Sequence, residues 1–408
     1  FAPGLTFIAL PIYFIAFPFL EKFLPDILFG NSKIELKLIA LNILATIFIS
    51  SLLAALTCVL VYRISSYFTQ NKKTKLFVTF TLAFSTLFFL YSTGYYARII
   101  AVFFSFFSFY KLIKMKNDFR ELNRKNLFIS GLFSSIAISM DYPHFIISGI
   151  LFFYLLTFLR NKKIIYFIIG VIIPILLILS YHYYIFKNPF QTPVHQRAHI
   201  PDLKYLNKGL GGFDSLHLDK LFLYSFSLER GLFFYNPILL LSFFGICLGI
   251  KKYKSEMLVI FFVWLATYLL YSSSTWPWWW DGSFGPRYLL ATVPYLILPL
   301  NFALDKIKPF IAFLFLIPSF FINLLGTMYD RTGFWTYPFD VYNPVFNTYI
   351  PLFLERGFSN YTLNIIAYKL INLPVYLINV IFFIEILFLI IIIRYIWRIE
   401  MNKNVLIK

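Results

Sequence analysis

Charged residues are scarce in this sequence, and acidic residues are the scarcest of them. Only 13% of the 408 residues are charged, with 18 acidic side chains against 36 lysines and arginines. A soluble domain carries about 25% charged and roughly 45–50% apolar residues, whereas 60% of this chain is hydrophobic. A soluble core of this length cannot bury so much apolar surface. The composition therefore excludes an ordinary soluble domain and predicts one membrane-embedded unit over 1–408.

Features of disulfide-linked and nucleic-acid-binding proteins are also missing. The two cysteines, Cys58 and Cys247, both lie inside apolar runs, so no disulfide framework is expected. The net charge of +18 is divided among short clusters between apolar runs. This distribution is typical of membrane topology rather than of a nucleic-acid surface. We therefore expect membrane lipids, and no nucleic acid, among the partners.

Long apolar runs fill most of the chain. A bilayer core requires about 20 apolar residues per helix, with a range of about 17–25. The run 5–20 is broken by Pro11 and Pro18 and predicts an interfacial helix or a short span. The predicted fold is an all-α polytopic membrane protein with about 11 transmembrane helices besides that N-terminal one. We assign these spans to 35–62, 76–93, 95–113, 126–141, 143–160, 163–185, 235–250, 257–274, 288–304, 309–328 and 372–397.

Basic residues gather in alternate connections between these runs. Every second connection between the runs, starting with the one after 35–62, can be taken as cytoplasmic. These short connections then hold most of the basic residues. By the positive-inside rule we predict a multi-pass plasma-membrane protein with a cytoplasmic C-terminus and an active face outside. That outer face carries two long loops, about 186–234 and 329–371, which are rich in Tyr, Asn, Gly and Pro and expected to be ordered.

Ionisable residues are rare in the middle of the predicted spans, and Glu385 is the clearest exception. An ion-coupled transporter usually places carboxylates or broken helices near the membrane midplane. Here the charged residues gather at the outer ends of helices instead. This placement favours chemistry at the membrane surface over transport through it.

The turn Asp141-Tyr142-Pro143-His144 joins two apolar runs at the predicted outer boundary. One interpretation is structural, because Asp accepts backbone N–H bonds at a helix start and Pro is tolerated in the first turn. The other is functional, because a carboxylate held at the lipid boundary is suited to acid–base chemistry. The two interpretations are compatible, and both stay open.

The segment 228–237 begins a predicted helix on the outer side. Glu229 and Arg230 are adjacent, so they point in different directions on a helix. An interfacial anchor with a solvated charge pair would account for both side chains. The glycine and the aromatic residues that follow at once favour a binding role instead.

A tryptophan-rich turn at 276–288 is the strongest local signal. Four of the seven tryptophans, Trp280 the last of them, lie within five positions and are followed by Asp281 and a Gly-Ser-Phe-Gly-Pro-Arg turn. An aromatic girdle at the membrane interface explains the tryptophans but does not require that turn. The turn's glycines permit close backbone approach. Arg287 then reaches headgroup depth, where a guanidinium suits a phosphate, and aromatic faces suit sugar rings.

A histidine pair in the first long loop could suggest a metal site. His195 and His199 have the i, i+4 spacing of a helical metal pair, but the glutamate of the zincin pattern does not follow His195. The pair also lies between Pro193 and Pro201, where histidines are usually solvated. We assign no metal ligand.

Taken in order, these motifs resemble the polytopic glycosyltransferases of the GT-C superfamily, which use polyprenyl-phosphate sugars. The similar branch contains the protein-mannosyltransferase and lipid A aminoarabinose transferase relatives of bacteria and archaea. Ala2-Pro3-Gly4-Leu5, followed by Ile8-Ala9-Leu10-Pro11, resembles the family's Lys-(Ala/Pro)-Pro-x-Leu segment, and Asp141-Tyr142-Pro143 resembles its acidic-Tyr-Pro turn. Arg230-Gly231-Leu232-Phe233 with Asn236-Pro237 resembles its Arg-Gly-Leu-Phe…Ser-Pro helix start. Gly282-Ser283-Phe284-Gly285-Pro286-Arg287-Tyr288 resembles its Gly-x-x-Phe-Gly-Pro-Arg-Tyr turn.

The resemblance implies an inverting hexosyl- or pentosyltransferase that moves a sugar from a polyprenyl-phosphate donor to a glycan, lipid or protein acceptor. It implies no organic cofactor, and in this family a divalent cation such as Mg²⁺ or Mn²⁺ sometimes assists the departing phosphate. Asp141 would be a secondary catalytic acid. The residues expected to bind the donor phosphate and sugar are Glu229, Arg230, Trp280, Asp281, Arg287, Tyr288 and His144.

The chain departs from the family pattern at its N-terminus. The family's main catalytic acid lies at the outer end of a first helix, and the chain opens at Phe1 within the next motif. We therefore expect that helix, the start of the first outer loop and the principal base to precede Phe1, with processing as the alternative explanation. On this expectation 1–408 by itself is inactive as a transferase. A flippase for lipid-linked sugars and a glycan polymerase or ligase are the alternative functions.

Overall fold

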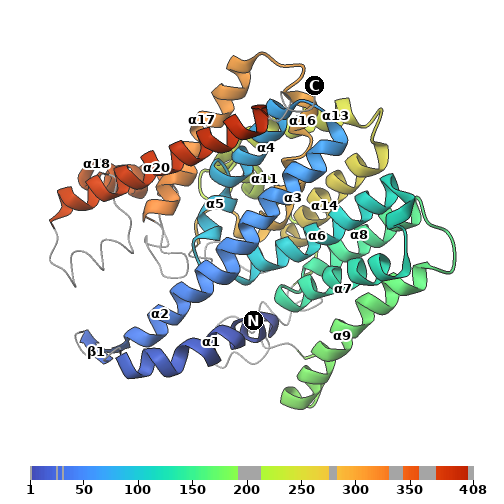
Figure 1. Ribbon diagram of the computed structural model, residues 1–408, viewed down its shortest axis with the longest axis horizontal. Coiled ribbons are helices and arrows are strands. Elements are labelled where there is room, and N and C mark those ends of the chain that lie inside the picture. Colours follow the sequence, from blue (N-terminus) through green and yellow to red (C-terminus); the bar gives the residue numbers. More distant parts are fainter. Residues whose placement is uncertain are drawn as a thin grey trace.

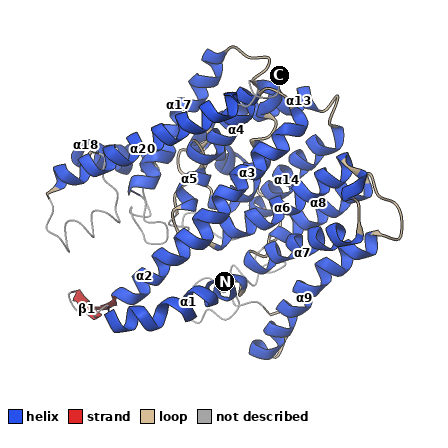
Figure 2. Ribbon diagram, in the orientation of Figure 1, coloured by secondary structure: helices blue, strands red, loops and turns tan. Residues whose placement is uncertain are grey.

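The structure is a computed structural model that describes residues 2–23, 26–29, 32–191, 213–274, 283–329, 343–357 and 374–402. Helices make up nearly all of it (Figures 1 and 2). The only strands among the described residues are β1 (Asp26–Phe29) and β2 (Ser32–Glu35), a short antiparallel hairpin in which Asp26 lies opposite Glu35. The predicted helical membrane protein class is therefore confirmed.

The described helices follow one another with short connections. In chain order they are α1 (Gly4–Phe23), α2 (Leu36–Ala45), η1 (Thr46–Ser51), α3 (Leu52–Phe68), α4 (Lys72–Phe84), α5 (Leu87–Ser92), α6 (Ala97–Asn117), η2 (Phe119–Glu121), α7 (Arg124–Met140), α8 (His144–Leu156), α9 (Ile164–Phe186), α11 (Leu218–Phe226), α12 (Leu232–Tyr235), η4 (Pro237–Leu239), α13 (Leu240–Gly249), α14 (Lys254–Ser272), η6 (Arg287–Thr292), α15 (Val293–Leu296), α16 (Leu300–Ala303), α17 (Pro309–Tyr329), η7 (Val345–Tyr349), α18 (Ile350–Arg356) and α20 (Val375–Asn402).

Six of the described helices are long and apolar enough to cross a membrane, and the eleven predicted full-length spans are not confirmed. The six cover Gly4–Phe23, Lys37–Phe68, Ile164–Phe186, Lys254–Ser272, Pro309–Tyr329 and Asn379–Met401, and two shorter apolar helices cover His144–Leu156 and Pro237–Gly249. Several predicted runs are instead built from pieces. The run 288–304 contains Pro294 and Pro299 and consists of 3₁₀ and short α-helical turns.

The predicted span 76–93 is divided at Ser85 and Thr86. α4 ends at Phe84, and α5 begins after Thr86, whose hydroxyl accepts a hydrogen bond from the backbone N–H of Phe88 at 3.2 Å. The freed N–H of Leu87 donates to the side-chain oxygen of Asn236 at 2.7 Å. A residue more than 140 positions away thus replaces the missing helical bond, and apolar periodicity carries no sign of it.

The N-terminal run predicted as an interfacial helix or a short span is the helix α1, and nothing decides between these two placements. It continues through Pro11 and Pro18, although each proline removes one backbone hydrogen bond from the helix. α1 lies beside α2, and the two helices meet at the β1–β2 hairpin (Figure 1). α2, η1 and α3 form one continuous helix of 32 apolar-rich residues from Lys37, about 48 Å long against a hydrocarbon core of about 30 Å.

The connections predicted to be cytoplasmic meet at one end of the bundle, here called the basic end (the connections 69–71, 118–123, 157–163, 250–253 and 304–308). Lys116 pairs with Glu256 at 2.6 Å, and the Tyr253 hydroxyl donates to the backbone oxygen of Tyr67 at 2.9 Å. The Thr74 hydroxyl lies 3.3 Å from the Asp305 carboxylate. The alternation inferred from charge is therefore reproduced as two ends of one bundle.

The connections predicted to be outside meet at the opposite end, here called the site end. The Tyr95 hydroxyl donates to the backbone oxygen of Leu5 at 2.5 Å, and that of Tyr91 to the backbone oxygen of Phe284 at 2.8 Å. The plasma membrane and the sidedness inferred from charge stay predictions.

We predict that the basic end is cytoplasmic. On a background lacking Cys58 and Cys247, a cysteine at the exposed position Asn188 should react with a membrane-impermeant maleimide in intact cells. A cysteine at the exposed position Lys252 should react only after permeabilisation. Labelling of position 252 but not 188 in intact cells would contradict this topology.

Candidate functional site

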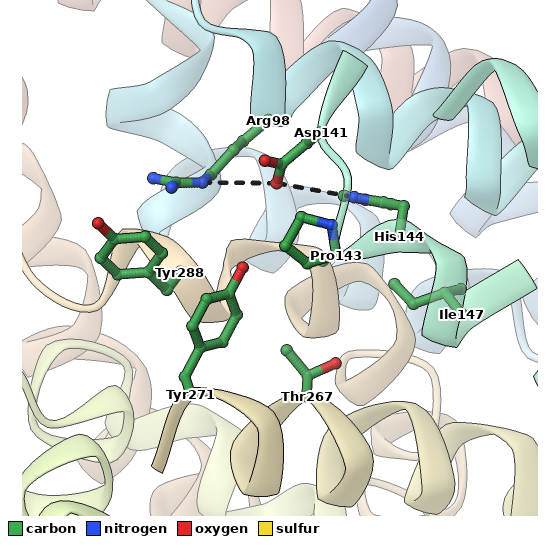
Figure 3. A pocket seen from close by; sticks show the side chains of 9 residues that line it. Arg98, Asp141, Pro143, His144, Ile147, Thr267, Tyr271 and Tyr288 are labelled. Atoms are coloured by element: carbon green, nitrogen blue, oxygen red, sulfur yellow. Dashed lines mark ion pairs between the residues drawn. The ribbon is translucent and has the colours of Figure 1, made fainter. Parts of the chain in front are cut away.

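A small cavity at the site end brings together parts of the chain that are far apart in sequence. Its lining comes from the start of α6, the α7–α8 turn, the end of α14 and η6 (Figure 3). Its volume is about 10 Å³, which suffices for about one water molecule. The lining residues are Arg98, Asp141, Pro143, His144, Ile147, Thr267, Tyr271, Tyr288 and Ala291.

The turn at 141–144 connects the end of α7 at Met140 to the start of α8 at His144. Asp141 is the C-terminal cap of α7, and the N–H of His144 donates to the Asp141 backbone oxygen at 3.1 Å. Pro143 precedes the first residue of α8, and no side chain caps that helix start. The helix-cap interpretation of the Asp141 side chain is therefore wrong, and its carboxylate faces other groups.

The Asp141 carboxylate lies between a guanidinium and an imidazole (Figure 3). Its Oδ2 is 3.5 Å from Nε of Arg98 and 3.7 Å from Nδ1 of His144. The Arg98 and Asp141 side chains are 22% and 20% exposed, so solvent can reach the pair. His144 is 2% exposed, and its Nε2 has no hydrogen-bond partner among the described residues. Because an unpaired buried polar atom is costly, this nitrogen indicates a place for water or a ligand.

Aromatic rings form the opposite wall of the cavity. The guanidinium carbon of Arg98 lies 4.1 Å from the ring centre of Tyr288, and that of Arg287 lies 5.4 Å from the same ring. The Tyr271 ring packs against Tyr288 with centroids 4.9 Å apart. Two arginines from distant segments thus share one tyrosine, an arrangement that concentrates positive charge beside a flat apolar face.

Arg230 fixes the turn that presents Arg287. Arg230 is 2% exposed, and its Nη1 donates to the backbone oxygens of Ser283 and, at 3.2 Å, of Gly285. Gly285 has a φ of 58°, a conformation that side chains disfavour. These bonds hold the turn in place, and the predicted role of Arg230 in donor binding stays a prediction.

Glu229 is the neighbouring carboxyl group and is only 6% exposed. Burial raises the pKa of this carboxyl from 4.5 to about 7, although the adjacent Arg230 opposes the rise. A carboxyl with such a pKa can carry a proton near neutral pH. The structure therefore contradicts the view of 229–230 as a solvated charge pair.

The start of the chain lies against the same region. A side chain added at Gly4 would come within 2.5 Å of the backbone oxygen of Ser139, so α1 approaches the end of α7 very closely. Ser139 is two residues from Asp141. The Ala2-Pro3-Gly4-Leu5 motif therefore lies beside the end of α7, shortly before the 141–144 turn.

Of the predicted site residues, Asp141, His144 and Tyr288 line the cavity, whereas Arg287 is not among the lining residues and lies 5.4 Å from the Tyr288 ring. Glu229 and Arg230 lie beside the turn at 283–288. Trp280, Asp281, His195 and His199 lie outside the described residues.

Sequence reasoning missed Arg98, Thr267 and Tyr271. Arg98 alone had a signal, because it is the one charged residue between positions 94 and 110 and stands at the outer end of a predicted span. Thr267 and Tyr271 lie within an apolar run in which nothing marks them.

The cavity does not fit a divalent cation. Asp141 supplies its one carboxylate, and that group already faces Arg98. Throughout the described ranges, no cluster of three or more His, Cys, Asp and Glu side chains occurs that could hold a metal. We therefore assign no step of the chemistry to a metal ion.

Comparison with known proteins does not extend the motif resemblance. No protein-family model matches the sequence, and no curated protein matches it. The resemblance to the GT-C superfamily thus rests on the sequence motifs alone.

We predict that ionisation of Glu229 lowers the free energy of unfolding as the pH rises through about 7. Because its pKa is raised in the folded state, its stabilising contribution is complete below pH 4.5 and is lost as the carboxyl ionises around pH 7. Glu229→Gln should remove this dependence and raise the melting temperature at pH 8 by a few degrees relative to wild type, with little change at pH 5. Melting curves in detergent at both pH values measure this. Equal pH dependence in the two proteins would refute the assignment to Glu229.

Proposed function

We propose that this chain is a membrane glycosyltransferase of the GT-C type, which transfers a sugar from a polyprenyl-phosphate donor to an acceptor at the outer membrane face. One observation carries the proposal. The acidic turn at 141–144 and Tyr288 line one cavity, Arg287 lies 5.4 Å from the Tyr288 ring, and Arg230 braces the turn that leads to both residues. All of them lie at the end of the bundle opposite the basic connections.

The assembled groups match the needs of sugar transfer from a lipid phosphate. A carboxylate must accept the proton of the acceptor hydroxyl as that oxygen attacks the sugar carbon. The bond from that carbon to the phosphate oxygen breaks, and cationic donors stabilise the departing phosphate. Asp141 offers the carboxylate in the secondary role predicted for it, and Arg287 offers the guanidinium. Tyr288 and Tyr271 offer apolar faces of the kind that pack against sugar rings.

The cavity must open for such a substrate to bind. A volume of about 10 Å³ admits a water or a hydroxyl oxygen, not a sugar phosphate. The partly exposed Arg98 and Asp141 side chains form the wall that solvent can reach.

A flippase is disfavoured by the surroundings of Glu385. This carboxylate was the clearest mid-membrane charge in the sequence, and it lies on an exposed face of α20, at the edge of the bundle (Figure 1). A transport pathway requires such groups to face the protein interior or a water-filled cavity. A glycan polymerase or ligase remains the alternative enzyme, and an acceptor assay distinguishes it.

The direct test is sugar transfer by the native full-length protein. Purified protein is mixed with a polyprenyl-phosphate sugar and a panel of glycan, lipid and peptide acceptors, and product is measured by mass spectrometry. Transfer of a single sugar with release of polyprenyl monophosphate supports the proposal. Chain elongation from a polyprenyl-diphosphate glycan, with no reaction of the monophosphate donor, would support a polymerase instead.

We predict that Arg287→Lys lowers transfer efficiency about 10- to 100-fold, because lysine cannot copy the planar two-donor contact to a phosphate. The matched control is Arg124→Lys. Arg124 lies 5.4 Å from the Tyr166 ring, as Arg287 does from Tyr288, but at the start of α7 at the basic end. Kinetics are compared on monodisperse protein in detergent. If Arg287→Lys and Arg287→Ala keep wild-type efficiency, Arg287 has no part in donor binding.

A further inference from the structure

We propose that His144 accepts the proton of the acceptor hydroxyl in the small cavity, and that Asp141 is the positioning residue that orients its imidazole. The inference rests on the proposed function and names the group that meets the acceptor. It also narrows the acceptor to an alcohol, such as a hydroxyl of a sugar, a lipid, a serine or a threonine. The resemblance places His144 only among the groups that bind the donor.

The two ring nitrogens of His144 have different surroundings. Nδ1 lies 3.7 Å from Oδ2 of Asp141, which precedes it by three residues in the same turn (Figure 3). In a neutral imidazole the nitrogen that faces a carboxylate holds the proton, and the other nitrogen keeps a lone pair. Nε2 is therefore an acceptor. It cannot donate to an anion, but it can receive the hydrogen of a hydroxyl group.

The lone pair of Nε2 is buried and unused. His144 is 2% exposed, and no group in the described part of the chain bonds Nε2. The buried His182 near the end of α9 differs, because its nitrogens lie 2.9 Å from the Tyr142 hydroxyl and 3.2 Å from the backbone oxygen of Pro189. A buried acceptor without a donor is unfavourable, so a group that brings an O–H to Nε2 gains a hydrogen bond there.

The cavity has the size of a single hydroxyl oxygen. His144 lines it together with Thr267 and Tyr271 of α14 and with the apolar Ile147 and Ala291. Its volume of about 10 Å³ holds about one water molecule, which an acceptor hydroxyl can replace. An acceptor nitrogen beside room for one oxygen selects an O–H group. The remainder of the acceptor would enter from the side that solvent reaches.

In the proposed step the acceptor O–H bond breaks and its proton passes to Nε2. The electron pair of that bond stays on the oxygen, which forms the new bond to the sugar carbon. The bond from that carbon to the phosphate oxygen breaks, and its electron pair stays on the phosphate. The Asp141 carboxylate beside Nδ1 stabilises the imidazolium that results. The proton later leaves to water past Asp141, whose side chain is 20% exposed.

The test measures transfer kinetics on the native full-length protein in detergent. His144→Gln should lower kcat about 100- to 10,000-fold, the usual contribution of a general base, and leave the KM of the donor within about twofold. The matched control is His217→Gln. His217 also follows an aspartate by three residues, with Nε2 3.1 Å from Oδ1 of Asp214, but its side chain is 35% exposed. Its substitution should leave kcat unchanged.

A double substitution separates positioning from direct catalysis. If Asp141 acts through His144, Asp141→Asn lowers kcat about 100-fold or more in the wild-type background but little further in the His144→Gln background. Losses that multiply would mean that Asp141 takes the proton itself, and they would overturn the proposal. Wild-type kcat in folded His144→Gln would also overturn it and leave the proton to the carboxylate expected before Phe1.

Nuclear magnetic resonance measures the tautomer without turnover. In protein labelled with ¹⁵N in histidine, the His144 signals are assigned by their loss in His144→Gln. Wild type should carry the proton on Nδ1 and none on Nε2, and Asp141→Asn should change this distribution. A proton on Nε2 in wild type would overturn the proposal even where the variants fold poorly.

The two measurements keep this inference distinct from the proposed function. If wild type and His144→Gln transfer sugar equally well, the inference fails and the transferase function stands. If wild type transfers no sugar to any acceptor, the proposed function fails. The nitrogen signals then still decide whether Nε2 is the open acceptor that a hydroxyl site requires.

Discussion

Backbone groups released where helices break at the site end must find partners within the protein, and the architecture of that end follows from this constraint. Water cannot satisfy them inside a membrane, and an unsatisfied group there costs several kcal/mol. The breaks are bridged across sequence. Asn323 donates to the backbone oxygen of Tyr235 at 2.8 Å, and the Ser319 hydroxyl accepts from the backbone N–H of Ile238 at 2.9 Å. Arg230 does the same for the 283–285 turn.

Buried polar groups are paired more completely at the basic end of the bundle than at the site end. At the basic end, Glu256 is 3% exposed and accepts from Lys116 at 2.6 Å and from the Tyr154 hydroxyl at 2.8 Å, so this buried charge is fully paired. At the site end, the Asp141 contacts are 3.5 Å and longer, and a nitrogen of His144 lacks a partner among the described residues. A satisfied network stabilises, whereas loosely paired groups in a cavity are typical of a binding site.

The sequence predicted the helical membrane class, the grouping of connections at two ends, the turn at 141–144, and a turn at 276–288 of which the structure describes 283–288. These features depend on composition, charge alternation and local turn residues, all of which a single chain displays. It did not predict the break between α4 and α5, because Asn236 that satisfies Leu87 comes from another part of the chain. It missed Arg98 and Tyr271 for the same reason. Their role depends on which helix ends become neighbours, and apolar periodicity does not specify that.

The breaks and the site coincide for a physical reason. The interior of a regular helix satisfies its own backbone groups and presents only side chains, so it offers few ways to turn a charged group toward a shared point. A break places a turn within the bundle, and the polar residues that bond its freed backbone groups fix that turn in one position. Phe284 shows the result, since it is fully buried between the rings of Tyr235 and Tyr349 while its backbone oxygen accepts from Tyr91. Arg287 follows three residues later. The hydrogen bonds and ring contacts that fix the broken helices therefore also hold its guanidinium beside the Tyr288 ring.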